Sequence, residues 1–88
     1  MNEPLKFSRE AWEDYLYWQT QDKKTLLRIN KLLQDIQRNG YQGLGKPEPL
    51  KGDKAGYWSR RIDESNRLVY RITDKTIEIR SCKTHYEN

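Results

Sequence analysis

The spacing of the apolar residues changes halfway along this chain, and that change limits the fold more than any other feature. Between residues 9 and 38, apolar residues recur at intervals of three and four, which is the period of an amphipathic helix. Beyond residue 56 they fall in three short runs separated by turn residues, at 57–62, 67–72 and 76–81. Such runs are typical of strands joined by hairpins. This order predicts an α+β protein.

The N-terminal part carries the signals of a short strand and a first helix. A strand is expected over Leu5–Phe7, and a helix over residues 9–19 with Ser8 as its N-cap. Phe7 and Trp12 occupy the two positions of a hydrophobic staple, which sets the direction in which the chain enters a helix.

A second helix is expected after a break at residues 20–22. Arg38 lies in its last turn, and Asn39 and Gly40 form its C-terminal cap. Its apolar stripe and its basic side fall largely on opposite faces, the stripe being Leu26, Ile29, Leu33 and Ile36. Two such helices joined by a short turn must bury their apolar faces against another element.

The last hairpin has a register that its turn predicts. If residues 74–75 are a two-residue turn, Ile72 lies opposite Ile77, and Tyr70 lies opposite Ile79. All four side chains then share one face, which is the face that the two helices would cover.

The preceding hairpin places arginines on the opposite face. With a three-residue turn at 63–65, Trp58 joins Tyr70 on the buried side, and Arg61 lies directly opposite Arg67 on the other. We therefore expect two N-terminal helices packed on one face of a small antiparallel sheet. Two opposed like charges are destabilising unless an anion lies between them, so this face is predicted to bind an anionic ligand.

The length and composition limit the number of domains, the class of ligand and the cofactors that this chain can have. A chain of 88 residues is expected to form one domain, residues 1–88. The net charge of +4 suits RNA, DNA or an acidic protein. One cysteine excludes an internal disulfide and indicates a reducing cytoplasm, and one cysteine with one histidine cannot build a zinc site. We expect no metal, no cofactor, and neither a signal peptide nor a membrane span.

A few residues supply the groups that cleave RNA without a metal. Glu48 lies between two prolines, His85 is the only histidine, and Arg60, Arg61 and Arg67 form a dense set of cations. A base, an acid and fixed cations are the parts that such cleavage requires.

Five segments of the chain closely resemble one family of bacterial toxins. Their order and spacing resemble the YoeB (Txe/YoeB) toxins of the RelE-like superfamily, and the segments are residues 12–18, 45–51, 56–62, 67–70 and 85–86. The resemblance covers nearly the whole chain. The departures are a slightly extended N-terminus and two residues after Tyr86, which could displace the chain end.

The resemblance implies a fold, an activity and partners. The fold is RelE-like, with two helices on a small antiparallel sheet. The activity is a ribosome-dependent endoribonuclease that cuts mRNA in the A site of the 70S ribosome and arrests translation. The partners are a YefM-type antitoxin and a second copy of the chain. The location is cytoplasmic.

The resemblance also assigns roles in metal-free attack by the 2′-hydroxyl. Glu48 matches the general base and His85 the general acid, because imidazole titrates near physiological pH. Arg67 matches the cation over the scissile phosphate, which a planar guanidinium can contact in bidentate fashion. The expected products are a 2′,3′-cyclic phosphate and a 5′-hydroxyl.

Further residues are expected to support the site. Lys51 and Arg61 match supporting cations, and Tyr86 matches a residue that stacks on or orients the substrate base. Arg60 and Tyr57 are also expected to bind the substrate or to support the site, with Tyr57 on the active face.

Each assignment has an ordinary structural alternative. A terminal histidine is usually a surface residue, an acid between prolines a solvated turn residue, and a pair of arginines a charged sheet face. Two other functions stay open: a non-enzymatic inhibitor like the gyrase-targeting ParE relatives, and a simple RNA-binding module.

Overall fold

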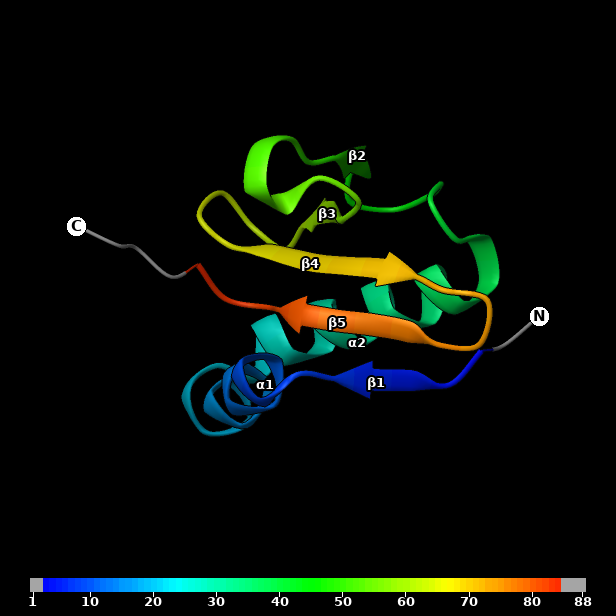
Figure 1. The fold of residues 1–88 in the computed structure, drawn as a ribbon. Helices are drawn as coiled ribbons and strands as arrows, with labels where there is room; N and C mark the ends of the chain where they lie inside the picture. The colour runs from blue at the N-terminus through cyan, green and yellow to red at the C-terminus, as the bar shows by residue number, and fades with distance from the viewer. Residues whose placement is uncertain (1–2, 85–88) are drawn as a thin grey trace.

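The computed structural model describes residues 3–84, which form two helices and a five-stranded sheet (Figure 1). In Figure 1, α2 lies behind the sheet and α1 lies beside the ends of β1 and β5, so neither helix covers the front face. The predicted α+β class is confirmed. The sheet has the strand order β1-β5-β4-β3-β2, and a 3-10 turn covers Gly52–Lys54. The helices and strands are α1 (Arg9–Gln21), α2 (Lys23–Asn39), β1 (Leu5–Phe7), β2 (Glu48–Pro49), β3 (Trp58–Arg61), β4 (Arg67–Ile72) and β5 (Ile77–Ser81).

The prediction of a purely antiparallel sheet is wrong at one edge. β1 runs parallel to β5, with Leu5 opposite Ile77 and Phe7 opposite Ile79. β1 comes first in the chain and β5 last, so both helices and the other strands separate them. No hairpin turn therefore sets the direction of β1.

Both helix starts follow from their capping residues. The Ser8 hydroxyl accepts a hydrogen bond from the backbone N–H of Ala11 at 3.0 Å. Asp22 ends α1 through its backbone N–H and caps α2 through its carboxylate. The rings of Phe7 and Trp12 meet edge to face with centroids 6.0 Å apart, as the staple predicts.

The predicted registers of both hairpins are confirmed. Arg61 lies opposite Arg67 in the β3–β4 pair, and Ile72 lies opposite Ile77 in the β4–β5 pair. The apolar parity of the strands decided these registers, because a slip by one residue would expose the core side chains.

The core fills the space between the helices and the covered face of the sheet. Its helical members include Ile29, Leu32 and Ile36, and its sheet members include Leu68 and Tyr70, all at most 1% exposed. Burial of this contiguous apolar layer is the main force that holds the helices on the sheet.

Cys82 lies inside this core. Its side chain is 0% exposed, and its thiol donates a hydrogen bond to the Ala11 carbonyl at 3.7 Å. Burial raises the pKa of the Cys82 thiol to about 12. A thiolate, the nucleophilic form, is therefore scarce at neutral pH.

We expect Cys82 to be unreactive until the protein unfolds. Ellman's reagent at pH 8 should detect no thiol in the native protein and one thiol per chain in denaturant. Rapid native labelling would contradict this burial, since it would require the segment after β5 to open.

Candidate active site

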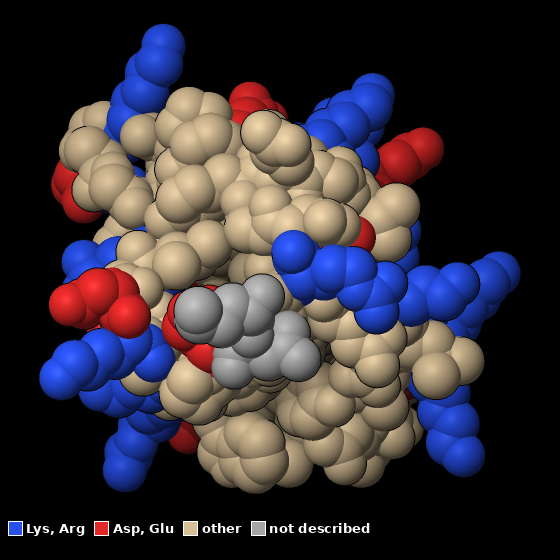
Figure 2. Space-filling model, turned by 90° about the vertical axis from the view of Figure 1, so that its right-hand side faces the viewer, with Lys and Arg blue, Asp and Glu red and all other residues tan. Residues whose placement is uncertain are grey.

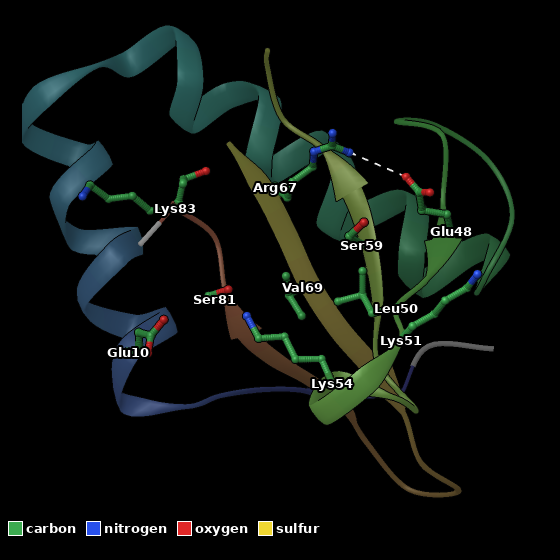
Figure 3. Close-up of a pocket in the computed structure, with 11 residues that line it drawn as sticks. Glu10, Glu48, Leu50, Lys51, Lys54, Ser59, Arg67, Val69, Ser81 and Lys83 are labelled. Carbon is green, nitrogen blue, oxygen red and sulfur yellow. Dashed lines mark ion pairs between the residues drawn. The ribbon is translucent and has the colours of Figure 1, made fainter. Parts of the chain in front are cut away.

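The open face of the sheet carries a cleft of about 460 Å³ (Figure 3). Its floor is one row of cross-strand neighbours, in which Glu48 lies opposite Ser59, Ser59 opposite Val69, and Val69 opposite Ser81. Directly opposed residues share a face, so one row of strand pairing builds the floor. The side chains of Ser59, Val69 and Ser81 are small, which leaves the hollow open.

A β-bulge brings Ser81 to this floor. Tyr70 lies opposite Ile79, but the next residue of β4, Val69, lies opposite Ser81, so Arg80 is the extra residue. Without the bulge, an arginine would occupy the place of the serine. Bulges often re-aim a side chain beside an active site.

The rim of the cleft is mainly cationic. Figure 3 shows Glu48 and Arg67 pointing toward one another at one side of the hollow, with Glu10 and Lys83 at the other. Four cations and two carboxylates line it, namely Lys51, Lys54, Arg67, Lys83, Glu10 and Glu48. This excess of positive charge suits a phosphodiester.

Glu48 and Arg67 form an ion pair that a substrate can reach. The distance from Arg67 Nη1 to Glu48 Oε1 is 3.8 Å, and the side chains are 37% and 60% exposed, respectively. An exposed pair of this kind contributes only about 0–1 kcal/mol to stability. Glu48 stands on the edge strand β2, and Pro49 beside it is compatible with an edge because it offers no N–H to a further strand.

The structure brings three of the predicted site residues together. Glu48, Lys51 and Arg67 line the one cleft although up to 19 positions separate them in the sequence. The predicted residues His85 and Tyr86 lie outside the described residues. Thr84, the last described residue, lines the same cleft.

Arg61 lies on the same face but not in the lining of the cleft. It is exposed, and within residues 3–84 its guanidinium forms no ion pair. Its backbone anchors two other segments: its N–H donates to the Gly45 carbonyl at 2.7 Å, and its carbonyl accepts from Arg28 Nη2 at 3.1 Å.

The expectation that Arg60 contacts substrate on the open face is wrong. Its side chain is 0% exposed and points into the covered face. Arg60 lies two residues from both Trp58 and Ile62, so the three side chains point to the same face of the strand. Leu68, a core residue, lies opposite Arg60 in the β3–β4 pair. This parity was a signal in the sequence that the density of arginines obscured.

Arg60 instead ties the loop after α2 to β3. Its guanidinium donates to Asp35 Oδ2 at 2.5 Å and to the Tyr70 hydroxyl at 3.1 Å. It also donates to three loop carbonyls at 2.8–2.9 Å, those of Gly40, Gln42 and Leu44. A buried charge needs such complete pairing. The loop then leads into β2, which carries Glu48.

Asp35 gives this cluster a pH dependence. Burial opposes its ionisation, but hydrogen bonds from Arg60, the Leu44 N–H and the Asn39 side chain outweigh burial and hold the pKa of Asp35 below its ordinary value of 3.8. The unfolded chain therefore binds a proton at Asp35 before the folded chain does.

We expect the free energy of unfolding to fall as the pH drops below about 4, because the unfolded chain then gains a proton at Asp35 that the folded chain does not bind. Above that range the stabilisation by Asp35 is fully present. Urea denaturation between pH 7 and pH 3 should show a smaller acid loss in Asp35→Asn than in wild type. Asp74→Asn, an exposed turn variant, is the control and should follow wild type.

The last predicted residue, Tyr57, lies outside the lining of the cleft. It lines a smaller hollow of about 170 Å³. Sequence reasoning missed four residues of the rim, Glu10, Lys54, Lys83 and Thr84. It also missed Leu50 and the residues of the cleft floor, Ser59, Val69 and Ser81. Small polar and apolar residues carry no chemical signature in a sequence, so only the strand pairing identifies them.

Residues 3–84 contain neither a cluster of metal ligands nor a helix that could span a membrane. No group of three or more His, Cys, Asp or Glu side chains is arranged to hold a metal ion. No helix in this part of the chain has the length and apolar character that crossing a bilayer requires.

The architecture is shared with a solved bacterial protein. YafQ from Escherichia coli strain BL21(DE3) superposes with a TM-score of 0.71 at 21% identity, over 96% of this chain and 94% of that chain. The fold and the cleft together define a small α+β protein of the YafQ fold with a cationic hollow on its open sheet face.

Closer relatives identify the family. A family model described as the YoeB-like toxin of bacterial type II toxin–antitoxin systems matches residues 7–86. Toxin YoeB of Escherichia coli strain K12 is 51% identical over 82 residues, which cover 93% of this chain and 98% of that protein. This chain belongs to the YoeB-like toxin family, as the resemblance in its sequence indicates.

Two solved structures of Staphylococcus aureus YoeB are also similar. A YoeB dimer matches with a TM-score of 0.89 at 50% identity, over 98% of this chain and 100% of that chain. A heterotetrameric YoeB–YefM toxin–antitoxin complex matches with a TM-score of 0.90, also at 50% identity and with the same coverage.

Proposed function

We propose that this toxin is a ribosome-dependent endoribonuclease that cuts mRNA in the ribosomal A site without a metal. The observation that supports this most is the meeting of Glu48 and Arg67, 3.8 Å apart, in one accessible cationic cleft. Thr84 also lines this cleft, and His85 is the next residue in the sequence.

Glu48, His85 and Arg67 each carry out one part of the reaction. Glu48 takes the proton of the 2′-hydroxyl, whose oxygen attacks the adjacent phosphorus. The bond from phosphorus to the 5′-oxygen breaks, and His85 gives that oxygen a proton. One bond to phosphorus forms and one breaks, which leaves a 2′,3′-cyclic phosphate and a 5′-hydroxyl.

The cations act on the phosphate. Arg67 stabilises the charge that develops on the five-coordinate phosphorus, with the preorganised donors of a planar guanidinium. Lys51 holds the neighbouring backbone from the rim of the cleft. Arg61 lies one row further along the open face, where it can contact the RNA that leaves the cleft. Tyr86 orients the substrate base.

The proposal extends to partners and location. By analogy with the Staphylococcus aureus complexes, a YefM-type antitoxin neutralises this chain, and two copies can associate. Residues 1–88 act as one domain in the cytoplasm, where ribosomes are found.

Primer extension on mRNA from an in vitro translation reaction tests the activity. Purified toxin should produce cuts within codons only when ribosomes are present. Intact transcripts with wild-type toxin would contradict the proposal. Inhibition of DNA gyrase in a supercoiling assay, with mRNA uncut, would favour the ParE-like alternative instead.

A further inference from the structure

A second hollow, of about 170 Å³, lies beside the catalytic cleft on the same face of the sheet. At two places in the sequence, a residue that lines one hollow lies close to a residue that lines the other. On β5, Arg80 lines the second hollow and Ser81 lines the cleft. Before β3, Tyr57 lines the second hollow and Lys54 lines the cleft.

An aromatic ring held between cations forms one wall of this hollow. The Arg71 guanidinium lies 4.9 Å from the centroid of the Tyr57 ring, and the Arg80 guanidinium lies 5.4 Å from it. Cations over a ring face are attracted by its quadrupole, so the three groups hold one another in place.

The hollow is positive despite one carboxylate in its lining. Glu78 accepts a hydrogen bond from Arg71 Nε at 2.6 Å, so its charge is matched. Arg80 and Lys6 also line the hollow, and within residues 3–84 neither forms an ion pair. Two cations are therefore available to an anion.

We propose that this hollow, the Tyr57 site, binds a backbone phosphate of single-stranded RNA next to the phosphate held in the cleft. This inference rests on the proposed function. Arg71 lies two residues beyond Val69 of the cleft floor, a step of about 7 Å along β4. A strand leaving the cleft can cross this distance with its next nucleotide.

The chemistry of the site favours RNA over an acidic peptide. Basic grooves lined with aromatic side chains are the usual means of holding single-stranded nucleic acid. Guanidinium planes also offer surfaces on which unstacked bases lie. An acidic peptide could use the charges, but it would not need the aromatic ring or the continuity with the cleft.

The test compares three variants, each of which removes one positive charge. Arg80→Gln and Lys6→Gln remove exposed cations of the Tyr57 site, and Lys31→Gln removes an exposed cation of α2, which packs on the opposite face. The probe is a fluorescent 2′-O-methyl oligoribonucleotide, which lacks the 2′-hydroxyl and cannot be cut by the proposed route. Anisotropy titrations over a range of KCl concentrations give the affinity and its salt dependence.

We expect Arg80→Gln and Lys6→Gln each to weaken binding about fivefold and to reduce the slope of log K against log salt by about 0.7, the contribution of one phosphate contact on a single strand. Lys31→Gln should match wild type. Melting curves check that all variants are folded.

Three results would overturn the inference: wild-type affinity and slope in both site variants, an equal loss in Lys31→Gln, or no measurable binding by wild type. Weakened binding of an oligoglutamate peptide with unchanged RNA binding would also overturn it, and would assign the site to an acidic protein. Failure of the proposed function has a separate readout, since wild-type toxin would then leave mRNA intact in the ribosome assay.

Discussion

Replacing Glu48 with glutamine should slow mRNA cleavage by about 10²- to 10⁴-fold, the usual contribution of a general base. Glutamine keeps the size and polarity of the side chain but cannot accept the proton of the 2′-hydroxyl. The measurement is the rate of appearance of cut ends by primer extension, with toxin and programmed ribosomes in fixed amounts. Growth arrest in cells that express the variant should be lost in parallel.

Glu64→Gln is the matched control for this variant. Glu64 is an exposed carboxylate in the turn between β3 and β4 and is absent from the lining of the cleft. Both variants remove one negative charge, so a general electrostatic effect would change both rates alike. Equal rates for Glu48→Gln and wild type would exclude Glu48 as the base.

Replacing Arg60 with methionine should lower the free energy of unfolding by about 3–5 kcal/mol, the usual cost of breaking a buried ion pair by removing one partner. Methionine fills much of the space of the arginine stem but leaves the Asp35 carboxylate without its cation. It also leaves the Tyr70 hydroxyl and the three loop carbonyls without that donor. The midpoint of thermal unfolding should fall by roughly 12 °C or more in a domain of this size.

Arg71→Met provides the comparison. Arg71 also pairs with a carboxylate, Glu78, at 2.6 Å, but its side chain is 45% exposed, so the expected loss is about 0–1 kcal/mol. The double variant Arg60→Met, Asp35→Leu should recover part of the stability, because no buried charge then lacks a partner. A melting point of Arg60→Met close to that of Arg71→Met would contradict the role given to the buried cluster.

Much of the fold could be predicted because it depends on local patterns. The Ser8 cap, the staple of Phe7 and Trp12, and the C-terminal cap at Gly40 each depend on residues within one or two turns. The hairpin registers were predictable as well, since short turns and apolar parity leave one pairing that buries the core.

The positions of two arginines show where prediction from local pattern fails. Arg60 and Arg67 are both cations on the strands of one hairpin, yet Arg60 is 0% exposed, whereas the side chain of Arg67 is 37% exposed. Charge usually indicates solvent exposure, and Arg60 is an exception because Asp35 and the loop carbonyls pair it. Those partners come from another helix and loop, which the residues around Arg60 do not reveal.

The sequence by itself determined the helices, the two hairpins and the family, because capping, periodicity and ordered motifs act over short distances along the chain. The tertiary structure alone decided the parallel pairing of β1, the partners that surround the buried Arg60, and the cleft that brings Glu48, Lys51 and Arg67 together. A bulge in β5 also completes the floor of that cleft with Ser81. These features depend on which strands become neighbours, and contacts between residues far apart in the chain decide that.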